Sequence, residues 1–296
     1  MRVRRFAEVY MTVRAVARER AAGSRRIPDW VIVLTLLFAA WHNKPIFWAC
    51  QRGHWPAWLL RIIERVAAVP SSTTMSRRLR RPGVTEFLDA CMGLAQRDLG
   101  RSLVAILDGT PLEVRAHSKD RHATFGWSRG RTGRGYKLHL LLDRSGRILA
   151  FKLAPLDVSE LEMAPRLVRQ APWLAYVLGD SLYDAHAVHR SVAVMGGQLV
   201  APRQHPGTTL GHRAAARFGP RRRSIDLLEG PGTFGRALLG QRGTIERFFG
   251  QLDAGGEGLG ELPSWVRTYP RVRAWVHAKL AIHTITRHHN RAHLAA

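Results

Sequence analysis

Two aspartates stand at the points where short apolar runs end. Asp108 ends the run SLVAILD, and Asp180 ends the run AYVLGD. Continuous apolar runs of this length are typical of strands that are buried on both faces of a sheet. Aspartate is common in the turns that follow strands, but two carboxylates at neighbouring strand ends could also hold a cation. Both interpretations stay open at this point.

Glu246 is the best candidate for a third acid beside these two aspartates. It lies in the segment RGTIERFFGQL, where Ile245, Phe248 and Phe249 can anchor an amphipathic helix on a sheet. Arg242 precedes Glu246 by one helical turn, so it could hold that carboxylate or contact a phosphate.

Three converging carboxylates predict a site for Mg²⁺ or Mn²⁺, because these ions prefer oxygen ligands and leave positions for water and substrate phosphates. Two such ions about 4 Å apart would activate the attacking oxygen and stabilise the leaving oxygen in phosphodiester chemistry. Without metal the carboxylates would repel one another, and one would tend to keep a proton. We therefore predict that Asp108, Asp180 and Glu246 are both the catalytic residues and the ligands of two ions.

Other acids near strand ends have local explanations. Asp143 ends an apolar run, but the DRSG sequence that follows predicts a hairpin turn. Asp184 is predicted to be the N-cap of a helix, and Glu113 to be a surface residue beyond its strand. Asp108 and Asp180 differ from these because the order of the elements brings their strand ends together.

That order is three strands followed by alternating helices and strands. The strands are predicted at residues 102–108, 136–143, 147–155, 175–180 and 198–202, and the helices at 159–172, 184–197, 242–252 and 270–290. This succession predicts an α/β fold with a ribonuclease-H-like mixed five-stranded sheet flanked by helices. The first and fourth strands would be parallel neighbours at a topological switch point, where ligand sites of open sheets lie. Residues 203–240 read as irregular.

The first 99 residues are predicted to form an all-helical DNA-binding region, and residues 100–296 the catalytic domain with a C-terminal helix. Residues 1–26 read as a helical but loosely held basic arm. Residues 56–81 fit a helix-turn-helix, because small polar and basic side chains on its second helix could enter the major groove and grip phosphates. An ordinary helical hairpin with a solvated basic face is the alternative. The candidate DNA-binding residues are Ser72, Thr73, Thr74, Ser76, Arg77 and Arg78.

The charge of the chain points to a polyanionic partner. Lys and Arg total 46 against 22 acidic residues, a net charge of +24, which favours nucleic acid over a membrane. Lys137, at the end of the glycine-rich stretch GRTGRGYK, is expected to face phosphate, as is Arg242. The apolar run at residues 30–41 is too short to span a bilayer, and two widely separated cysteines fit a reducing cytoplasm.

The ordered segments LDGTPLEV, SKDRHATFGWSRGRTGRGYKLHLLLD, LGDSLYDA and RGTIERFFGQL resemble the successive blocks of bacterial insertion-sequence DDE transposases. The resemblance covers residues 100–285. It implies a ribonuclease-H-like core with Asp108, Asp180 and Glu246 as the metal-binding triad. Where the family often has a tyrosine before the arginine and a lysine after the glutamate, this chain has Leu239 and Asp253.

The function that follows is DNA transposition. The core would cut a phosphodiester at the element end, and the freed 3′-OH would attack target DNA. The resemblance implies a homodimer on double-stranded DNA, in the bacterial cytoplasm at the nucleoid, with no membrane partner and no small-molecule cofactor. A metal-dependent nuclease of the same fold that lacks strand transfer is one alternative. A non-enzymatic DNA-binding protein derived from a transposase is the other.

Overall fold

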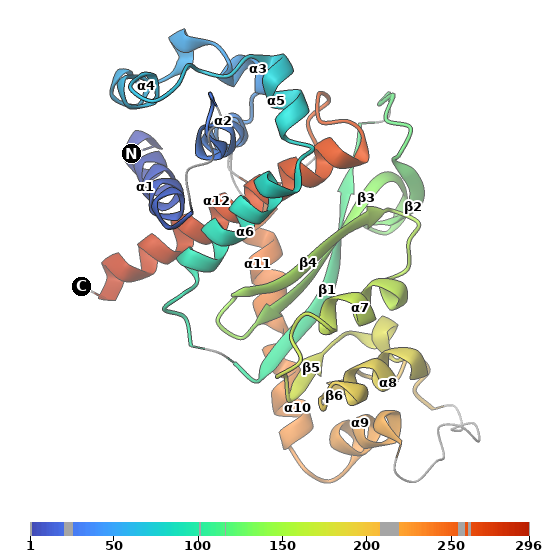
Figure 1. Cartoon of the computed structure of the whole chain (residues 1–296). Helices are drawn as coiled ribbons and strands as arrows, with labels where there is room; N and C mark the ends of the chain where they lie inside the picture. The colour runs from blue at the N-terminus through green and yellow to red at the C-terminus, as the bar shows by residue number, and fades with distance from the viewer. Residues whose placement is uncertain are drawn as a thin grey trace. The chain divides into compact units, whose positions relative to one another are not determined.

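The computed structural model divides the chain into two compact units (Figure 1). The first comprises Met1–Asp98, Arg115–His122 and Leu252–Ala296, and the second Leu99–Val114 and Ala123–Gln251. The structure describes residues 2–20, 26–100, 102–115, 117–207, 219–253, 258–259 and 262–295.

The first unit is helical. Its elements are α1 (Arg2–Glu19), α2 (Asp29–Trp41), α3 (Ile46–Ala49), the 3₁₀ helix η1 (Arg52–His54), α4 (Ala57–Glu64), α5 (Ser72–Arg78), α6 (Pro82–Ala95) and α12 (Tyr269–Ala295). Every residue of α2 from Trp30 to Trp41 is buried, so its continuous apolar sequence belongs to the centre of this unit. No helix in the described parts of the chain is long and apolar enough to cross a bilayer.

Helix α1 is held more firmly than its basic composition predicts. Phe6, Val9, Val13 and Val16 are all buried, and their spacing of three or four residues forms one apolar stripe. The ring of Phe6 packs edge-on against that of Phe38 in α2, at 5.3 Å between centroids. The expectation of a loosely held arm is therefore wrong for residues 6–16, because these four side chains anchor the helix in the core of the first unit.

The C-terminal helix α12 packs within the first unit. Lys279 is fully buried on it and donates to Asn43 Oδ1 at 2.6 Å. Helix α12 therefore groups with the N-terminal helices, whereas the sequence placed it with residues 100–296. The first boundary between the two units falls between Asp98 and Leu99.

The second unit is a mixed sheet with helices on both faces. The strands are β1 (Val104–Glu113), β2 (Thr124–Ser128), β3 (Arg131–Asp143), β4 (Ile148–Pro155), β5 (Tyr176–Leu178) and β6 (Gln198–Val200). Their order is β2-β3-β1-β5-β6, and β4 also pairs with β3. The helices are α7 (Glu160–Val168), η2 (Ser181–Tyr183), α8 (His186–Val194), α9 (Pro220–Glu229), α10 (Phe234–Leu239), η3 (Gly240–Arg242) and α11 (Gly243–Asp253).

The topology is ribonuclease-H-like, as predicted. Strands β1, β3 and β4 form an antiparallel meander, and β1 pairs in parallel with β5, which pairs in parallel with β6. Asp143 makes the turn between β3 and β4, because its Oδ1 accepts from the backbone N–H groups of Ser145 and Arg147 at 2.8 and 2.9 Å. Its hairpin role is confirmed.

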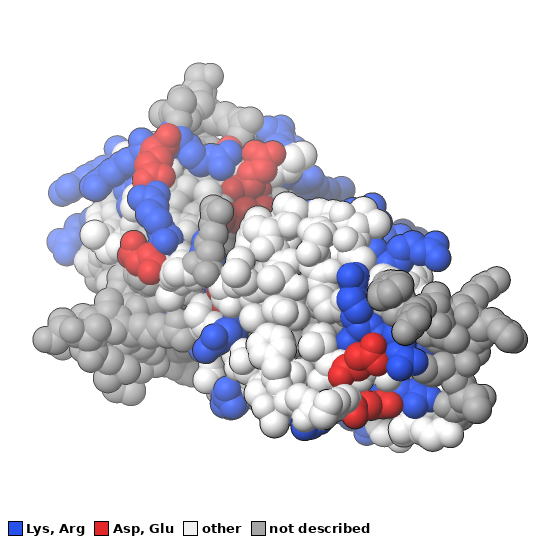
Figure 2. Space-filling view, turned by 90° about the horizontal axis from the view of Figure 1, so that it is seen from below, with Lys and Arg blue, Asp and Glu red and all other residues white. Residues whose placement is uncertain are grey.

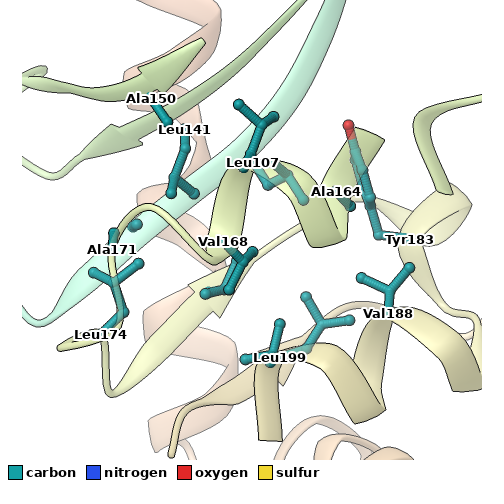
Figure 3. Packing of buried hydrophobic residues seen from close by; sticks show 14 of the residues in the cluster. Leu107, Leu141, Ala150, Ala164, Val168, Ala171, Leu174, Tyr183, Val188 and Leu199 are labelled. Atoms are coloured by element: carbon teal, nitrogen blue, oxygen red, sulfur yellow. The ribbon is translucent and has the colours of Figure 1, made fainter. Parts of the chain in front are cut away.

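One face of the sheet carries α7 and α8, and α10 and α11 lie behind the sheet in the view of Figure 1. Leu107, Leu141, Val177 and Leu199 project from four strands into a buried cluster with residues of α7 and α8 (Figure 3). Because side chains alternate along a strand, the residues beside these point to the opposite face.

Two stretches differ from the predicted elements. The glycine-rich sequence before Tyr136 is not a loop, because Arg131–Gly135 begins β3 and pairs with β2, a strand that the sequence did not predict. A Cβ on Gly135 would lie 2.2 Å from the carbonyl oxygen of Leu112, so only glycine permits this pairing. Within the expected irregular stretch 203–240, residues 208–218 lie outside the described part, and α9 and α10 follow.

Candidate active site

Asp108 lies inside β1 and not at its end. The strand continues to Glu113 in contact with β3, but its parallel neighbour β5 stops at Leu178, opposite Ile106. Asp108 is therefore at the end of the β1–β5 pairing, where a sheet edge opens. The correction leaves the functional prediction intact, because the edge next to β5 is the topological switch point.

The register of β1 and β5 brings Asp108 and Asp180 side by side. Val104, Ala105 and Ile106 pair with Tyr176, Val177 and Leu178. The same register, carried two residues further, sets Asp108 opposite Asp180, and neighbouring strands lie about 4.8 Å apart. Leu107 points into the α7–α8 core, so Asp108 points to the other face, on the side of α11.

Local backbone bonds fix both aspartates. Asp108 Oδ1 accepts from the N–H of Gly109 at 2.8 Å, and Asp180 Oδ1 accepts from the N–H of Leu182 at 2.9 Å. The second bond makes Asp180 the N-cap of η2. Capping and ligand binding are compatible, because a carboxylate has two oxygens and several lone pairs.

Glu246 and Arg242 approach this pair from the chain segment that begins α11. Ile245 and Phe248 are buried and hold that helix in place, while Glu246 is exposed. Arg242 ends η3, and its Nε is buried with no hydrogen-bond partner among the described residues. The helix predicted from the apolar spacing thus exists, with its acid on the solvent side.

The pKa of Asp108 is raised from 3.8 to about 6. Burial is the largest cause, because it disfavours the charged form. The N–H of Gly109 lowers the pKa, the charge of Asp180 raises it, Arg242 lowers it and Glu246 raises it. The charges of both other acids of the predicted triad therefore act on Asp108. Arg242 offsets only part of their effect on its pKa.

The donor chemistry fits a hard divalent cation. The three acids supply oxygen ligands only, which suits Mg²⁺ or Mn²⁺, and a cation would relieve the repulsion that raises the pKa of Asp108. Within the described residues, no group of three or more His, Cys, Asp or Glu side chains stands ready to hold an ion. The charges of the three acids thus interact, but their side chains do not converge into a complete metal site.

Lys137 lies on the opposite face of the sheet from Asp108. It is buried, and its Nζ donates to Glu160 Oε1 of α7 at 2.6 Å. His139 is buried next to it, and the pKa of His139 is lowered to about 4, chiefly by burial. The phosphate contact predicted for Lys137 stays a prediction, and in this conformation its ammonium group is paired with Glu160.

The helix-turn-helix candidates lie in the first unit. Ser71 caps α5 by accepting from the N–H of Thr74 at 3.2 Å. On α5 the exposed candidates are Ser72, Thr73 and Arg77, the half-buried ones are Thr74 and Ser76, and Arg78 is buried.

Arg78 has a structural contact. Its guanidinium pairs with Asp29 and donates to the carbonyl oxygen of Ile27 at 3.0 Å. Asp29 is the first residue of α2, and Pro28 before it holds the N-cap position without a side-chain cap. Residues 65–71 separate α4 from α5, a longer connection than the three or four residues typical of a helix-turn-helix, so that assignment stays a prediction.

The sequence missed the network around Asp184. This residue is buried and accepts two bonds from Arg221, Nε to Oδ1 at 2.8 Å and Nη2 to Oδ2 at 2.7 Å. His189 Nε2 lies 3.2 Å from Oδ1, and the N–H of Gln204 donates to Oδ2 at 3.1 Å. Asp184 is not the N-cap of α8, a position that Ala185 holds. No local signal links it to Arg221, 37 positions along the chain.

The sequence also missed Tyr183. Its ring packs in the α7–α8 core against a glycine, since a Cβ on Gly179 would lie 2.9 Å from Tyr183 Cδ2. Figure 3 shows the hydroxyl at the border of that cluster. The hydroxyl is buried without a hydrogen-bond partner among the described residues, and burial raises its pKa, with Asp108, Glu160 and Asp180 adding to the effect.

Glu113 was expected to lie beyond its strand, but it is the last residue of β1. Its Oε1 accepts a hydrogen bond from Ser128 Oγ at 2.6 Å.

A known protein family matches more than half of the chain. Among curated proteins no significant match to the chain is found. The family model of the transposase DDE domain matches residues 100–285, a span that includes every strand of the sheet and the three acids. The chain therefore belongs to the transposase DDE domain family.

Proposed function

We propose that this protein is a transposase that cuts DNA at transposon ends and joins the freed 3′-OH to target DNA. The observation that supports the proposal is the parallel β1–β5 pairing, which ends at Ile106 and Leu178, two residues before Asp108 and Asp180, together with the charges of Asp180, Glu246 and Arg242 that act on Asp108. Membership of the transposase DDE domain family supports transposase-type activity. Cleavage and strand transfer are the finer steps that we infer.

Each residue has a stated role. Asp108, Asp180 and Glu246 would hold two Mg²⁺ or Mn²⁺ ions, which when bound supply an activated oxygen nucleophile and stabilise the leaving oxygen. Arg242 would meet a DNA phosphate, since it has a buried Nε without a partner in the described part. At neutral pH Asp108 is ionised in most molecules, because its pKa is about 6.

DNA binding would extend beyond the carboxylates. The net charge of +24 favours phosphate contacts, and Figure 2 shows Lys and Arg side chains exposed on the surface. We propose α4 and α5 as a helix-turn-helix in which Ser72, Thr73 and Arg77 meet the DNA. Two ends must be joined, so we expect a homodimer on the DNA.

The test uses labelled duplexes taken from the DNA that flanks the coding sequence, with Mg²⁺ and a second, unlabelled duplex as target. Covalent products in which a 3′-OH end is joined to the target are expected. Nicks without joined products would contradict strand transfer and support the nuclease alternative. Binding without any cleavage would contradict both and support the non-enzymatic alternative. The variant Asp226→Asn, an exposed acid paired with Arg222 at 2.8 Å, is the control that should keep activity.

A further inference from the structure

The hairpin of β2 and β3 presents two large aromatic side chains to solvent. Phe125 and Trp127 are each 69% exposed, more than any other aromatic side chain among the described residues. They are two positions apart on a strand, so they lie on the same face of β2, with Cα atoms about 6.8 Å apart. Large exposed apolar side chains that lie together mark interaction sites.

The opposite face of the hairpin cannot accept these side chains. A Cβ on Gly126 would lie 2.6 Å from the carbonyl oxygen of Leu156, and one on Gly133 would lie 2.9 Å from Cβ of Ser128. Gly126 and Gly133 are cross-strand partners, so at these two positions the face has room for hydrogens only. A register slip by one residue would bring the rings onto it. The two rings are therefore held outward.

The basic side chains near the two rings indicate which class of molecule binds there. Arg134 is the cross-strand partner of Phe125, with its guanidinium carbon 5.8 Å from the ring centroid. Arg129 lies at the turn, whereas Arg131 is the cross-strand partner of Ser128 and so lies on the opposite face, where it pairs with Glu113 at 2.6 Å. An aromatic surface beside an arginine fits nucleic acid, because bases stack on the rings and guanidinium groups bind phosphates.

The spacing suits unpaired bases. Successive bases of a strand are 3.4 Å apart, so about 6.8 Å between the two Cα positions leaves the width of one base between rings that extend outward. Strand β3 leads from Arg134 to Leu140, the cross-strand partner of Asp108. At about 3.4 Å per residue, the hairpin lies about 20 Å along that strand from the acids, within the reach of one bound DNA segment.

We propose that Phe125 and Trp127 form a stacking site for unpaired bases of single-stranded or opened DNA, with Arg134 beside the first ring. The proposal depends on the proposed function only in that the ligand is DNA. It does not require cleavage. It extends the DNA-binding residues predicted from the sequence, none of which is aromatic.

The experiment measures binding of the full chain to a labelled single-stranded oligonucleotide by fluorescence anisotropy in EDTA, so that no cleavage occurs. Trp127→Ala is expected to weaken binding about tenfold, the effect of losing one base–aromatic stack, with an unchanged dependence on salt. Trp127→Tyr should restore most of the affinity. Trp173→Ala is the matched control, a tryptophan of the same unit that is 40% exposed, and its affinity should equal that of the wild type.

A second readout reports stacking itself. Fluorescence of 2-aminopurine in the oligonucleotide should be quenched by the wild type and much less by the double variant Phe125→Ala/Trp127→Ala. Equal affinity and equal quenching in both proteins would overturn the proposal. Loss of self-association with unchanged DNA binding would also overturn it, and would assign the rings to contact with a second copy. If the wild type stacks bases but never cleaves, the proposed function fails and this inference stands.

Discussion

Two aspartates four residues apart, Asp180 and Asp184, have different neighbours. The charge of Asp180 acts on Asp108, whose pKa is raised to about 6 chiefly by burial and further by Asp180 and Glu246, while Arg242 lowers it. The pKa of Asp184 is held well below its usual range, because the hydrogen bonds from Arg221, His189 and the N–H of Gln204 outweigh the effect of burial. Both follow the same strand.

The difference separates a group of acids whose charge Arg242 compensates only in part from a single acid that Arg221 and His189 contact directly. Asp184 contacts His189 of α8 and Arg221 of α9, so its carboxylate ties η2, α8 and α9 together. The acids at Asp108 repel one another in the metal-free protein, and such uncompensated charge is a mark of functional sites. Four predictions test this contrast.

The largest effect is expected from Asp180→Asn. The change removes one ionised ligand while an amide oxygen can still cap η2, so DNA cleavage should fall by about a thousandfold or more. Gel assays with Mg²⁺ measure it, and circular dichroism and anisotropy should show that fold and DNA binding persist. Cleavage within a few-fold of the wild type would contradict the assignment.

Asp184→Asn should instead act on stability. It leaves Arg221 partly buried without its anionic partner, and breaking a buried pair costs about 3–5 kcal/mol of the free energy of unfolding. Urea denaturation measures the loss. Asp226→Asn, which breaks an exposed pair with Arg222, should cost less than about 0.5 kcal/mol. If the two variants had equal free energies of unfolding, the structural role assigned to Asp184 would be wrong.

The third prediction concerns pH. Because the pKa of Asp108 is raised from 3.8 to about 6, its protonated form is favoured in the folded protein. The stability from this group is full below about pH 4 and is lost as pH rises through 6. In EDTA, the wild type should lose on the order of 2 kcal/mol relative to Asp108→Asn between pH 4 and 7. If the free energies of unfolding of the wild type and Asp108→Asn changed in parallel with pH, the prediction would be contradicted.

The smallest effect is expected from Arg242→Gln. The arginine lowers the pKa of Asp108, so its removal should raise that pKa further, by a fraction of a pH unit. The same denaturation series, or NMR titration of the carboxyl carbon, measures the shift. A lower pKa in the variant would mean that Arg242 does not act on this carboxylate.

The sequence was sufficient to predict the buried strands and the way they pair. The apolar runs before Asp108 and Asp180 identify β1 and β5, and their parallel pairing is confirmed because a meander followed by helix–strand units has few topologies. The length of β1 was wrong, since polar and glycine residues beyond Asp108 pair with β3 and carry no apolar signal. Strand β2 was missed because it has only five residues and its two aromatic side chains, Phe125 and Trp127, face solvent.

Side-chain partners were much less predictable. Local hydrogen bonds were accessible, as with Asp143 and the cap at Ser71, because both partners lie within a few residues. The pairs of Lys137 with Glu160, Arg78 with Asp29 and Arg221 with Asp184 join elements that are distant in sequence, and nothing near either residue indicates the other. Tertiary packing alone sets them.

The most direct test of the account is a crystal structure of the protein with Mn²⁺, with the ions located by their anomalous scattering. The account predicts anomalous peaks contacted by carboxylate oxygens of Asp108, Asp180 and Glu246, with Asp184 still bound to Arg221. Peaks at other residues, or no peak at these acids under saturating Mn²⁺ at neutral pH, would contradict it.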